Sequence, residues 1–278
     1  LTGTIPTDLG RLTALRSLSF SFASSLIGTI PTELGQLMAL TYLDFSFASS
    51  LIGTIPPQLG QLRALEGLYF LSASSLTGTI PTQLAQLTAL TDLDLGASSL
   101  TGPIPTELGQ LTALTHLSFI SASSLTVTIP TQLGQLTALR WLDLGASSLI
   151  GTIPTQLGQL TALTYLSFYS ASSLTGTIPT QLGQLTALTR LSFTCASSLI
   201  GTIPTELGQL RALEGLYFFY ASSLTLALLL IRQVAHWDHP DAAGTVDSAD
   251  VPLIQRSLVA HGHHPDAAGA VDSADVPL

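Results

Sequence analysis

One segment recurs along the chain at a nearly fixed interval, and this repetition constrains the fold more than any other feature. The segment Leu76–Ser99, LTGTIPTQLAQLTALTDLDLGASS, occurs nine times with small variations, at a period of about 24–25 residues. The copies begin at Leu1, Leu26, Leu51, Leu76, Leu100, Leu125, Leu149, Leu174 and Leu199. A unit this short cannot bury its apolar side alone, so the copies must stack into a solenoid with one continuous core.

The apolar spacing within each copy predicts which way each segment faces. In the second copy, alternation over residues 26–30 predicts a short strand, which Pro31 ends because proline has no N–H to donate. Leucines at three-residue intervals then predict a 3₁₀ turn, in which side chains at i and i+3 align. Alternation over residues 41–46 predicts another strand. The inward-facing set of this copy is Leu26, Ile30, Leu34, Leu37, Leu40, Leu43 and Phe45.

The pattern LxGxIPxxLGxLxxLxxLxL runs from Leu1 to about Ser223 and resembles the plant-specific leucine-rich repeat. The resemblance implies an α/β solenoid, a right-handed leucine-rich-repeat superhelix of nine coils with about 24–25 residues each. It implies a parallel sheet on the concave side, a second short sheet on the flank and a 3₁₀ or irregular convex side. The expected domains are the solenoid over residues 1–223, a capping helix over 224–237 and a small helical tail over 238–278.

The chain departs from this family at the position after the concave strand, where the family places asparagine. Serine is expected to hold that position, at Ser24, Ser49, Ser74, Ser98, Ser123, Ser147, Ser172, Ser197 and Ser222. A serine hydroxyl offers fewer hydrogen-bonding groups than a carboxamide, so we expect the ladder between coils to satisfy fewer buried groups.

Two related segments follow the solenoid, DAAGTVDSADVPL from Asp241 and DAAGAVDSADVPL from Asp266. They resemble the duplicated, EF-hand-like loop–helix unit of dockerins, which implies a calcium site and a cohesin-like docking partner. Histidine and alanine stand at two ligand positions of each loop, although calcium takes roughly 6–8 oxygen ligands. The alternative is a pair of acidic linkers that bind no metal. The metal-ligand candidates are Asp241, Asp247, Asp250, Asp266, Asp272 and Asp275.

Composition argues against several classes of partner. The formal net charge is −9, and all 8 basic residues are arginine, so the chain lacks the cationic surface that nucleic acid requires. No apolar run approaches the roughly 18 residues of a membrane span, and no signal peptide opens the chain. The single cysteine, Cys195, forms no internal disulfide and is expected to be a spare thiol rather than a nucleophile.

The copies differ most on the concave strands, where we expect a recognition surface. Outward positions there form columns that combine aromatic side chains with carboxylates, which favours a protein or carbohydrate ligand. The alternative is that the residues at these positions vary without constraint because they contact nothing. The candidate ligand-binding residues are Tyr42, Asp44, Tyr69, Asp92, Asp94, His116, Trp141, Asp143, Tyr165, Tyr169, Arg190 and Tyr217.

The flank carries a second regular surface, in which Ser-x-Thr/Ile-x-Thr recurs from the second copy onward, except where Pro103 replaces the last threonine. Flat threonine arrays of this kind resemble the surfaces of ice-binding β-solenoids, and some plant-type leucine-rich repeats are antifreeze proteins. The alternative explanation is that threonine and isoleucine favour exposed strands and that duplication of the repeat copied them. The candidate ice-binding residues are Thr2, Thr4, Thr29, Thr54, Thr77, Thr79, Thr126, Thr128, Thr152, Thr175, Thr177 and Thr202.

Catalysis is the third possibility, because His116 neighbours Asp92 and Ser118 in the predicted columns. An open sheet provides no pocket and no oxyanion donors, however. We therefore predict a non-enzymatic binding scaffold without a cofactor, in an extracellular or cell-surface setting. Its ligand is a protein or carbohydrate bound on the concave face; ice binding on the flank is the alternative.

Overall fold

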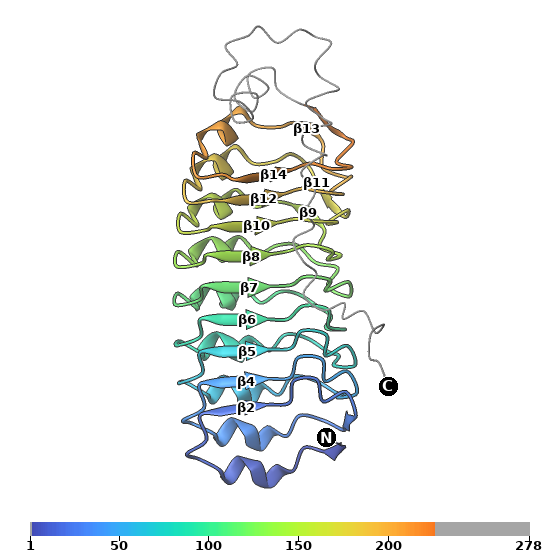
Figure 1. The fold of residues 1–278 in the computed structure, drawn as a ribbon, viewed down its shortest axis with the longest axis vertical. Coiled ribbons are helices and arrows are strands. Elements are labelled where there is room, and N and C mark those ends of the chain that lie inside the picture. Colours follow the sequence, from blue (N-terminus) through green and yellow to red (C-terminus); the bar gives the residue numbers. More distant parts are fainter. Residues whose placement is uncertain (1, 226–278) are drawn as a thin grey trace, which may run out of the picture. The chain divides into compact units, whose positions relative to one another are not determined.

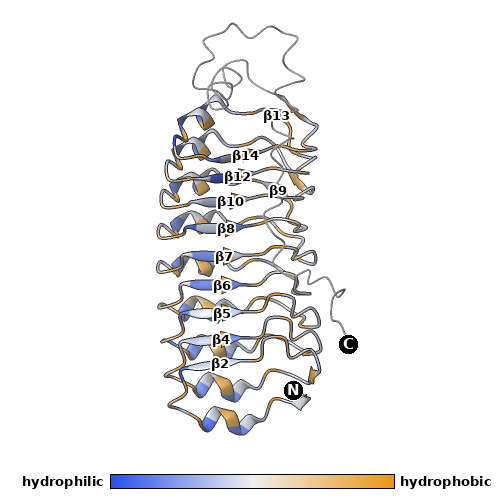
Figure 2. Cartoon of the chain, viewed as in Figure 1, coloured by the Kyte–Doolittle hydropathy of each residue, from blue (hydrophilic) through white to orange (hydrophobic). Residues whose placement is uncertain are grey.

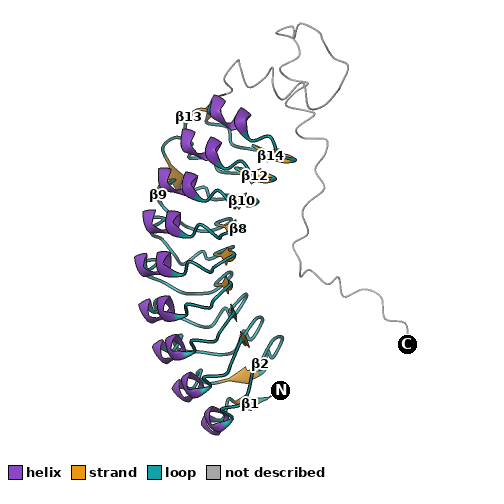
Figure 3. Cartoon of the chain, turned by 90° about the vertical axis from the view of Figure 1, so that its left-hand side faces the viewer, coloured by secondary structure: helices purple, strands orange, loops and turns teal. Residues whose placement is uncertain are grey.

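The computed structural model describes residues 2–225, which form a curved stack of coils (Figure 1). We number the coils 1 to 9 by the starting residues given above. Each coil contributes one strand to a concave sheet and one 3₁₀ helix to the opposite side, and Figure 3 shows these two layers on the inner and outer sides of the curve. The predicted solenoid is confirmed.

The concave sheet is parallel and follows chain order, because each coil adds one strand beside the previous one. Its central leucines pair in register, as Leu43 does with Leu68 and Leu68 with Leu93. Its nine strands are β2 (Ser17–Ser19), β4 (Tyr42–Asp44), β5 (Gly67–Tyr69), β6 (Asp92–Asp94), β7 (His116–Ser118), β8 (Trp141–Asp143), β10 (Tyr165–Ser167), β12 (Arg190–Ser192) and β14 (Gly215–Tyr217).

The convex layer consists of short 3₁₀ helices, each starting after a proline in extended conformation. The three-residue leucine spacing places Leu34 and Leu37 on one side of the turn, and both are fully buried. The helices are η1 (Thr7–Arg11), η2 (Thr32–Gln36), η3 (Pro57–Gln61), η4 (Thr82–Gln86), η5 (Thr106–Gln110), η6 (Thr131–Gln135), η7 (Thr155–Gln159), η8 (Thr180–Gln184) and η9 (Thr205–Gln209).

The core is a set of stacked leucine columns, and every residue of the predicted inward set in coil 2 is at most 3% exposed. Behind the concave sheet, phenylalanines stack from coil to coil, with ring centroids 5.3 Å apart for Phe45–Phe70 and for Phe168–Phe193. Leu95 and Leu144 replace phenylalanine in coils 4 and 6, which we call the short coils because each lacks one residue that the others have. The ring stack is interrupted at these two coils.

The flank differs from the single short sheet that was predicted. It consists of three two-stranded pairs, β1 (Gly3–Thr4) with β3 (Leu26–Ile27), β9 (Gly151–Thr152) with β11 (Leu174–Thr175), and β13 (Gly201–Thr202) with β15 (Leu224–Thr225). Isolated bridges such as Gly28 with Leu51 join other coils. Most coils place a glycine with positive φ in this segment, for example Gly53 at +85°.

The buried position after the concave strand was assigned to serine in every coil, and this is wrong for seven of them. Only Ser98 and Ser147 are buried there, and each hydroxyl donates to the carbonyl three residues earlier, at 2.7 and 2.6 Å. Both belong to the short coils. The extra residue of the other coils moves serine outward and places alanine inside, at Ala23, Ala48, Ala73, Ala122, Ala171, Ala196 and Ala221.

The C-terminal predictions fall largely beyond this region. Leu224 and Thr225, where a helix was expected to begin, form strand β15 instead. The remainder of that helix and the proposed calcium ligands Asp241 to Asp275 lie outside the described residues.

Candidate binding surfaces

The concave face presents the predicted columns of side chains in register. The first runs from Ser17 through Tyr42, and pairs Asp92 with His116, His116 with Trp141, and Trp141 with Tyr165. The second pairs Asp44 with Tyr69 and Ser192 with Tyr217. Parallel pairing therefore brings residues from distant parts of the chain onto one surface, because each strand lies about 4.8 Å from the next.

Two aromatic pairs dominate this face. The rings of Trp141 and Tyr165 stack with centroids 3.6 Å apart and planes inclined by 4°. Trp141 is 38% exposed, so the pair offers an open aromatic platform. Tyr42 and Tyr69 form the second pair, at 5.3 Å and 41°. Such rings supply a large contact area with little conformational freedom to lose, which suits ligand recognition.

The second-column aspartates Asp44, Asp94 and Asp143 were expected to face a ligand, but they bond to their own backbone instead. Asp44 and Asp143 are 7% and 6% exposed. Their Oδ1 atoms, like that of Asp94, accept the backbone N–H two residues later, at 2.8–2.9 Å. These carboxylates hold the turn that leaves the strand, where short polar side chains are favoured for this bond.

Burial has electrostatic consequences for these groups. It raises the pKa of Asp94 and of Asp143, and hydrogen bonds from backbone and serine groups only partly offset it. Burial and nearby carboxylates raise the pKa of Tyr69 to about 12. Burial, together with the bond from its hydroxyl to Asp44, also raises the pKa of Tyr42. The tyrosines therefore stay neutral at physiological pH and act as amphipathic contact groups.

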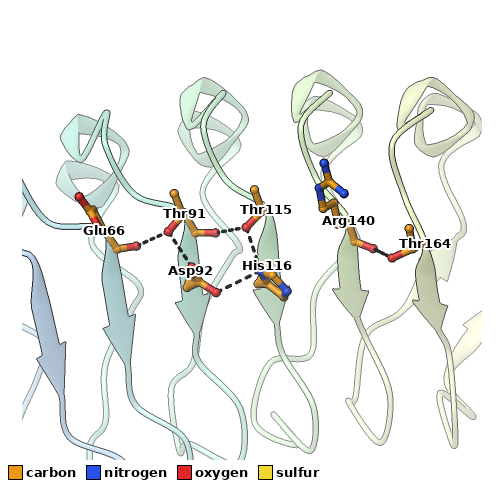
Figure 4. A network of polar contacts seen from close by, with 7 residues as sticks. All are labelled: Glu66, Thr91, Asp92, Thr115, His116, Arg140 and Thr164. Atoms are coloured by element: carbon orange, nitrogen blue, oxygen red, sulfur yellow. Dashed lines mark hydrogen bonds and ion pairs between the residues drawn. The ribbon is translucent and has the colours of Figure 1, made fainter. Parts of the chain in front are cut away.

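His116 lies in a polar network at the centre of the face (Figure 4). Its Nδ1 is 3.0 Å from Oδ1 of Asp92 and 2.8 Å from the hydroxyl of Thr115. The Thr91 hydroxyl is 2.6 Å from the other oxygen of Asp92. In the part of the chain described, no group of three or more His, Cys, Asp or Glu side chains is placed to hold a metal ion. Ser118 pairs with Asp94 and Asp143 rather than with His116.

The remaining candidates divide by exposure. Arg190 and Tyr169 are exposed, and Tyr217 is half-buried. Two charged residues that the column analysis missed, Glu66 and Arg140, lie at the edge where the strands begin (Figure 4). Each immediately precedes a first-column residue in the sequence, and this adjacency was the available signal.

All twelve candidate threonines of the flank are exposed, as predicted. Their register, however, is offset by two residues, so that Thr4 lies opposite Ile27 and Thr79 opposite Thr101. In coils 1 to 4 and 6 to 8, the second threonine packs its methyl group against the flank glycine of the next coil. A Cβ built on Gly78 would lie 2.7 Å from Cγ2 of Thr54.

The first-position threonines also have a structural partner. Three of their hydroxyls donate to the glycine carbonyl of the preceding coil: Thr175 to Gly151 at 3.3 Å, and Thr77 to Gly53 and Thr101 to Gly78 at 3.4 Å. Isoleucine replaces threonine at this position in four coils and is 44–55% exposed there, at Ile27, Ile52, Ile150 and Ile200. The hydroxyl is therefore dispensable for the fold.

One coil boundary breaks the flank pattern twice. Coil 5 carries Pro103 where other coils have the second threonine, and coil 6 carries Val127 where others have glycine. Elsewhere the threonine methyl of one coil contacts the glycine of the next, and these two exceptions occupy the equivalent positions of adjacent coils. A larger residue is accommodated where the threonine is absent.

Comparison with solved structures places this fold among leucine-rich-repeat proteins. The ectodomain of the receptor kinase GASSHO1/SCHENGEN3 from Arabidopsis thaliana, in complex with CASPARIAN STRIP INTEGRITY FACTOR 2, is 32% identical over 84% of this chain, with a TM-score of 0.66. The Arabidopsis receptor kinase HAESA, in complex with the peptide hormone IDA and the co-receptor SERK1, is 30% identical over 81%, with a TM-score of 0.62. This chain spans 33% and 41% of those chains.

A plant ice-binding protein is also similar, at 26% identity and a TM-score of 0.56, with 81% of this chain and 78% of that one covered. No family model and no curated protein sequence matches the chain. The repeats, the register and these structures establish a leucine-rich-repeat fold for the described residues. No helix among the described residues is long and apolar enough to cross a membrane.

Proposed function

We propose that the solenoid is a non-enzymatic extracellular scaffold that binds a polypeptide on its concave face. The observation that carries this is the Trp141–Tyr165 platform, an exposed stacked pair on the sheet where the repeats differ most. Flat aromatic pairs in an open groove are typical anchors for a ligand segment. The similar receptor kinase HAESA was solved in complex with a peptide hormone, which supports a polypeptide over a carbohydrate.

The test is binding of peptides to the full chain after removal of the platform. Trp141→Ala and Tyr165→Ala each should weaken binding roughly 10–100-fold, the range for a central aromatic anchor. Thr79→Ala, on the flank, is the control and should bind as the parent does. Peptides come from a randomised dodecapeptide display library selected on the full chain, and affinities are measured by calorimetry. Equal binding by the platform variants would refute the proposal.

Ice binding on the flank is a second candidate. It is supported by the exposure of all twelve threonines and by the similar plant ice-binding protein. Thermal hysteresis of the purified chain, lost in Thr79→Lys and Thr177→Lys but kept in Trp141→Ala, would establish it. Thr79→Val keeps the methyl group that packs on Gly102 and removes only the hydroxyl, so it separates ice contact from loss of the fold. A chain without hysteresis excludes this candidate.

A further inference from the structure

Accessible charges on the concave side are sorted by sign along the stack. Glu66 in coil 3 and Asp92 in coil 4 are negative. Arg140 in coil 6 and Arg190 in coil 8 are positive and exposed. Figure 2 shows the strands of coils 4, 5 and 8, β6, β7 and β12, coloured as hydrophilic. Between coils 3 and 8, the face is therefore acidic at one end and basic at the other.

These charges are mostly available to a ligand. Among the described residues, ion pairs within 4.0 Å are confined to Arg11–Asp8 on the convex side and His116–Asp92. Glu66, Arg140 and Arg190 have no such partner in that region. The buried aspartates Asp44 and Asp143 are engaged by backbone N–H groups and do not alter this pattern.

The sorting is confined to the middle of the stack. Arg16 in coil 1 and Glu214 in coil 9 have the opposite sign to their halves, so the polarity spans coils 3 to 8. The Trp141–Tyr165 platform lies in coils 6 and 7, within this span. An acidic patch, an aromatic platform and a basic patch thus lie within one stretch of the sheet.

We infer that the ligand is an extended polypeptide lying along the stack, with a basic and an acidic side chain about six residues apart. The inference rests on the peptide-binding function proposed above. Asp92 and Arg190 are four coils apart, or roughly 19 Å at about 4.8 Å per strand. An extended peptide rises about 3.3 Å per residue, so about six residues span that distance. The basic side chain lies over Glu66 and Asp92, and the acidic one over Arg140 and Arg190.

The test uses the same randomised dodecapeptide display library on the full chain. We expect enriched peptides to carry opposite charges about five to seven residues apart, flanking an aromatic or apolar residue. The double variant Arg140→Glu with Arg190→Glu makes the whole span acidic. It should bind a parent-selected peptide roughly tenfold less tightly, and reselection on it should yield two basic residues instead.

A matched control makes the same change in net charge on a different part of the surface. Arg63→Glu with Arg211→Glu alters two exposed arginines in the turns that follow helices η3 and η9, and should leave both affinity and selected pattern unchanged. Peptides that depend on Trp141 but show no charge pattern, or no reversal in the double variant, would overturn this inference and leave the binding function standing. A selection that enriches no Trp141-dependent peptide would overturn both.

Discussion

The concave face and the threonine flank are produced by the same coils, yet they obey different constraints. On the concave face, a continuous nine-stranded ladder fixes the backbone, and the central leucines of the inner strands, from Leu43 to Leu191, are buried in the core. Its outward neighbours vary from glycine to tryptophan. On the flank, the ladder is broken into pairs and bridges, and threonine methyls meet glycines of the next coil at close range.

This difference affects how the uniform threonine positions of the flank are interpreted. The threonine whose methyl packs against the next glycine is repeated with one exception, Pro103, and the next coil carries the one valine, Val127, in place of that glycine. The other flank position has no such packing and alternates between threonine and isoleucine. Packing between coils is therefore sufficient to explain the regular array. Variation on the concave face has no comparable structural cause, which favours that face as the recognition surface.

The largest expected effect comes from filling a flank glycine. Gly78→Val places a Cβ 2.7 Å from Thr54 Cγ2 at a residue with φ of +82°, so it should destabilise the chain by about 2–4 kcal/mol. Adding Thr54→Ala removes the clash and leaves the backbone penalty of about 1–2 kcal/mol. Denaturant unfolding with hydrogen exchange at coils 3 and 4 measures both. If Gly78→Val lowered the free energy of unfolding equally with and without Thr54→Ala, the methyl group of Thr54 would not be packed against Gly78 as described.

A smaller effect on stability is expected between coils 5 and 6, where Pro103 and Val127 interrupt the threonine–glycine pattern of the flank. Pro103→Thr should destabilise the chain while Val127 is present, because the new methyl group meets a side chain instead of glycine. Combined with Val127→Gly it should be tolerated, giving a coupling free energy of about 1–2 kcal/mol in a double-mutant cycle. Additive effects would mean that the two exceptions are unrelated.

The smallest expected effect concerns the contribution of one concave aspartate, Asp143, to the stability of the fold. Burial raises the pKa of Asp143 above its ordinary 3.8, so the folded chain binds a proton at higher pH than the unfolded chain. Its contribution to stability therefore increases as the pH falls from neutral through the raised pKa, and levels off below 3.8. Asp143→Asn keeps an oxygen for the Gly145 N–H without a buried charge.

We therefore expect the Asp143→Asn variant to have a higher unfolding midpoint at pH 7 than the parent and a smaller change between pH 7 and pH 4. Asp94 continues to titrate in the variant, so some pH dependence remains. Glu107→Gln, on convex helix η5, is the control and should follow the parent. A midpoint below that of the parent at pH 7 would show that the charge itself strengthens the turn.

Much of the fold could be predicted because the repeat presents each constraint nine times. Leu34, Leu37 and Leu43 were assigned inside from spacing alone, and all three are fully buried. The concave candidates were predicted as columns, and the parallel register places them so. The roles within the columns could not be predicted. Asp143 and Asp92 are the same residue type on the same sheet, yet one binds its own backbone and the other pairs with His116.

The sequence by itself determined the stacking of the coils, because so short a repeat has apolar groups that only another copy can cover. It also determined which residues of each copy face inward, through the spacing of its leucines. Only the tertiary structure decided which serine lies inside, since one extra residue in a coil shifts that position by one. It also decided that the flank threonines fit the glycines of the next coil, because this contact depends on an offset between coils that no single copy contains.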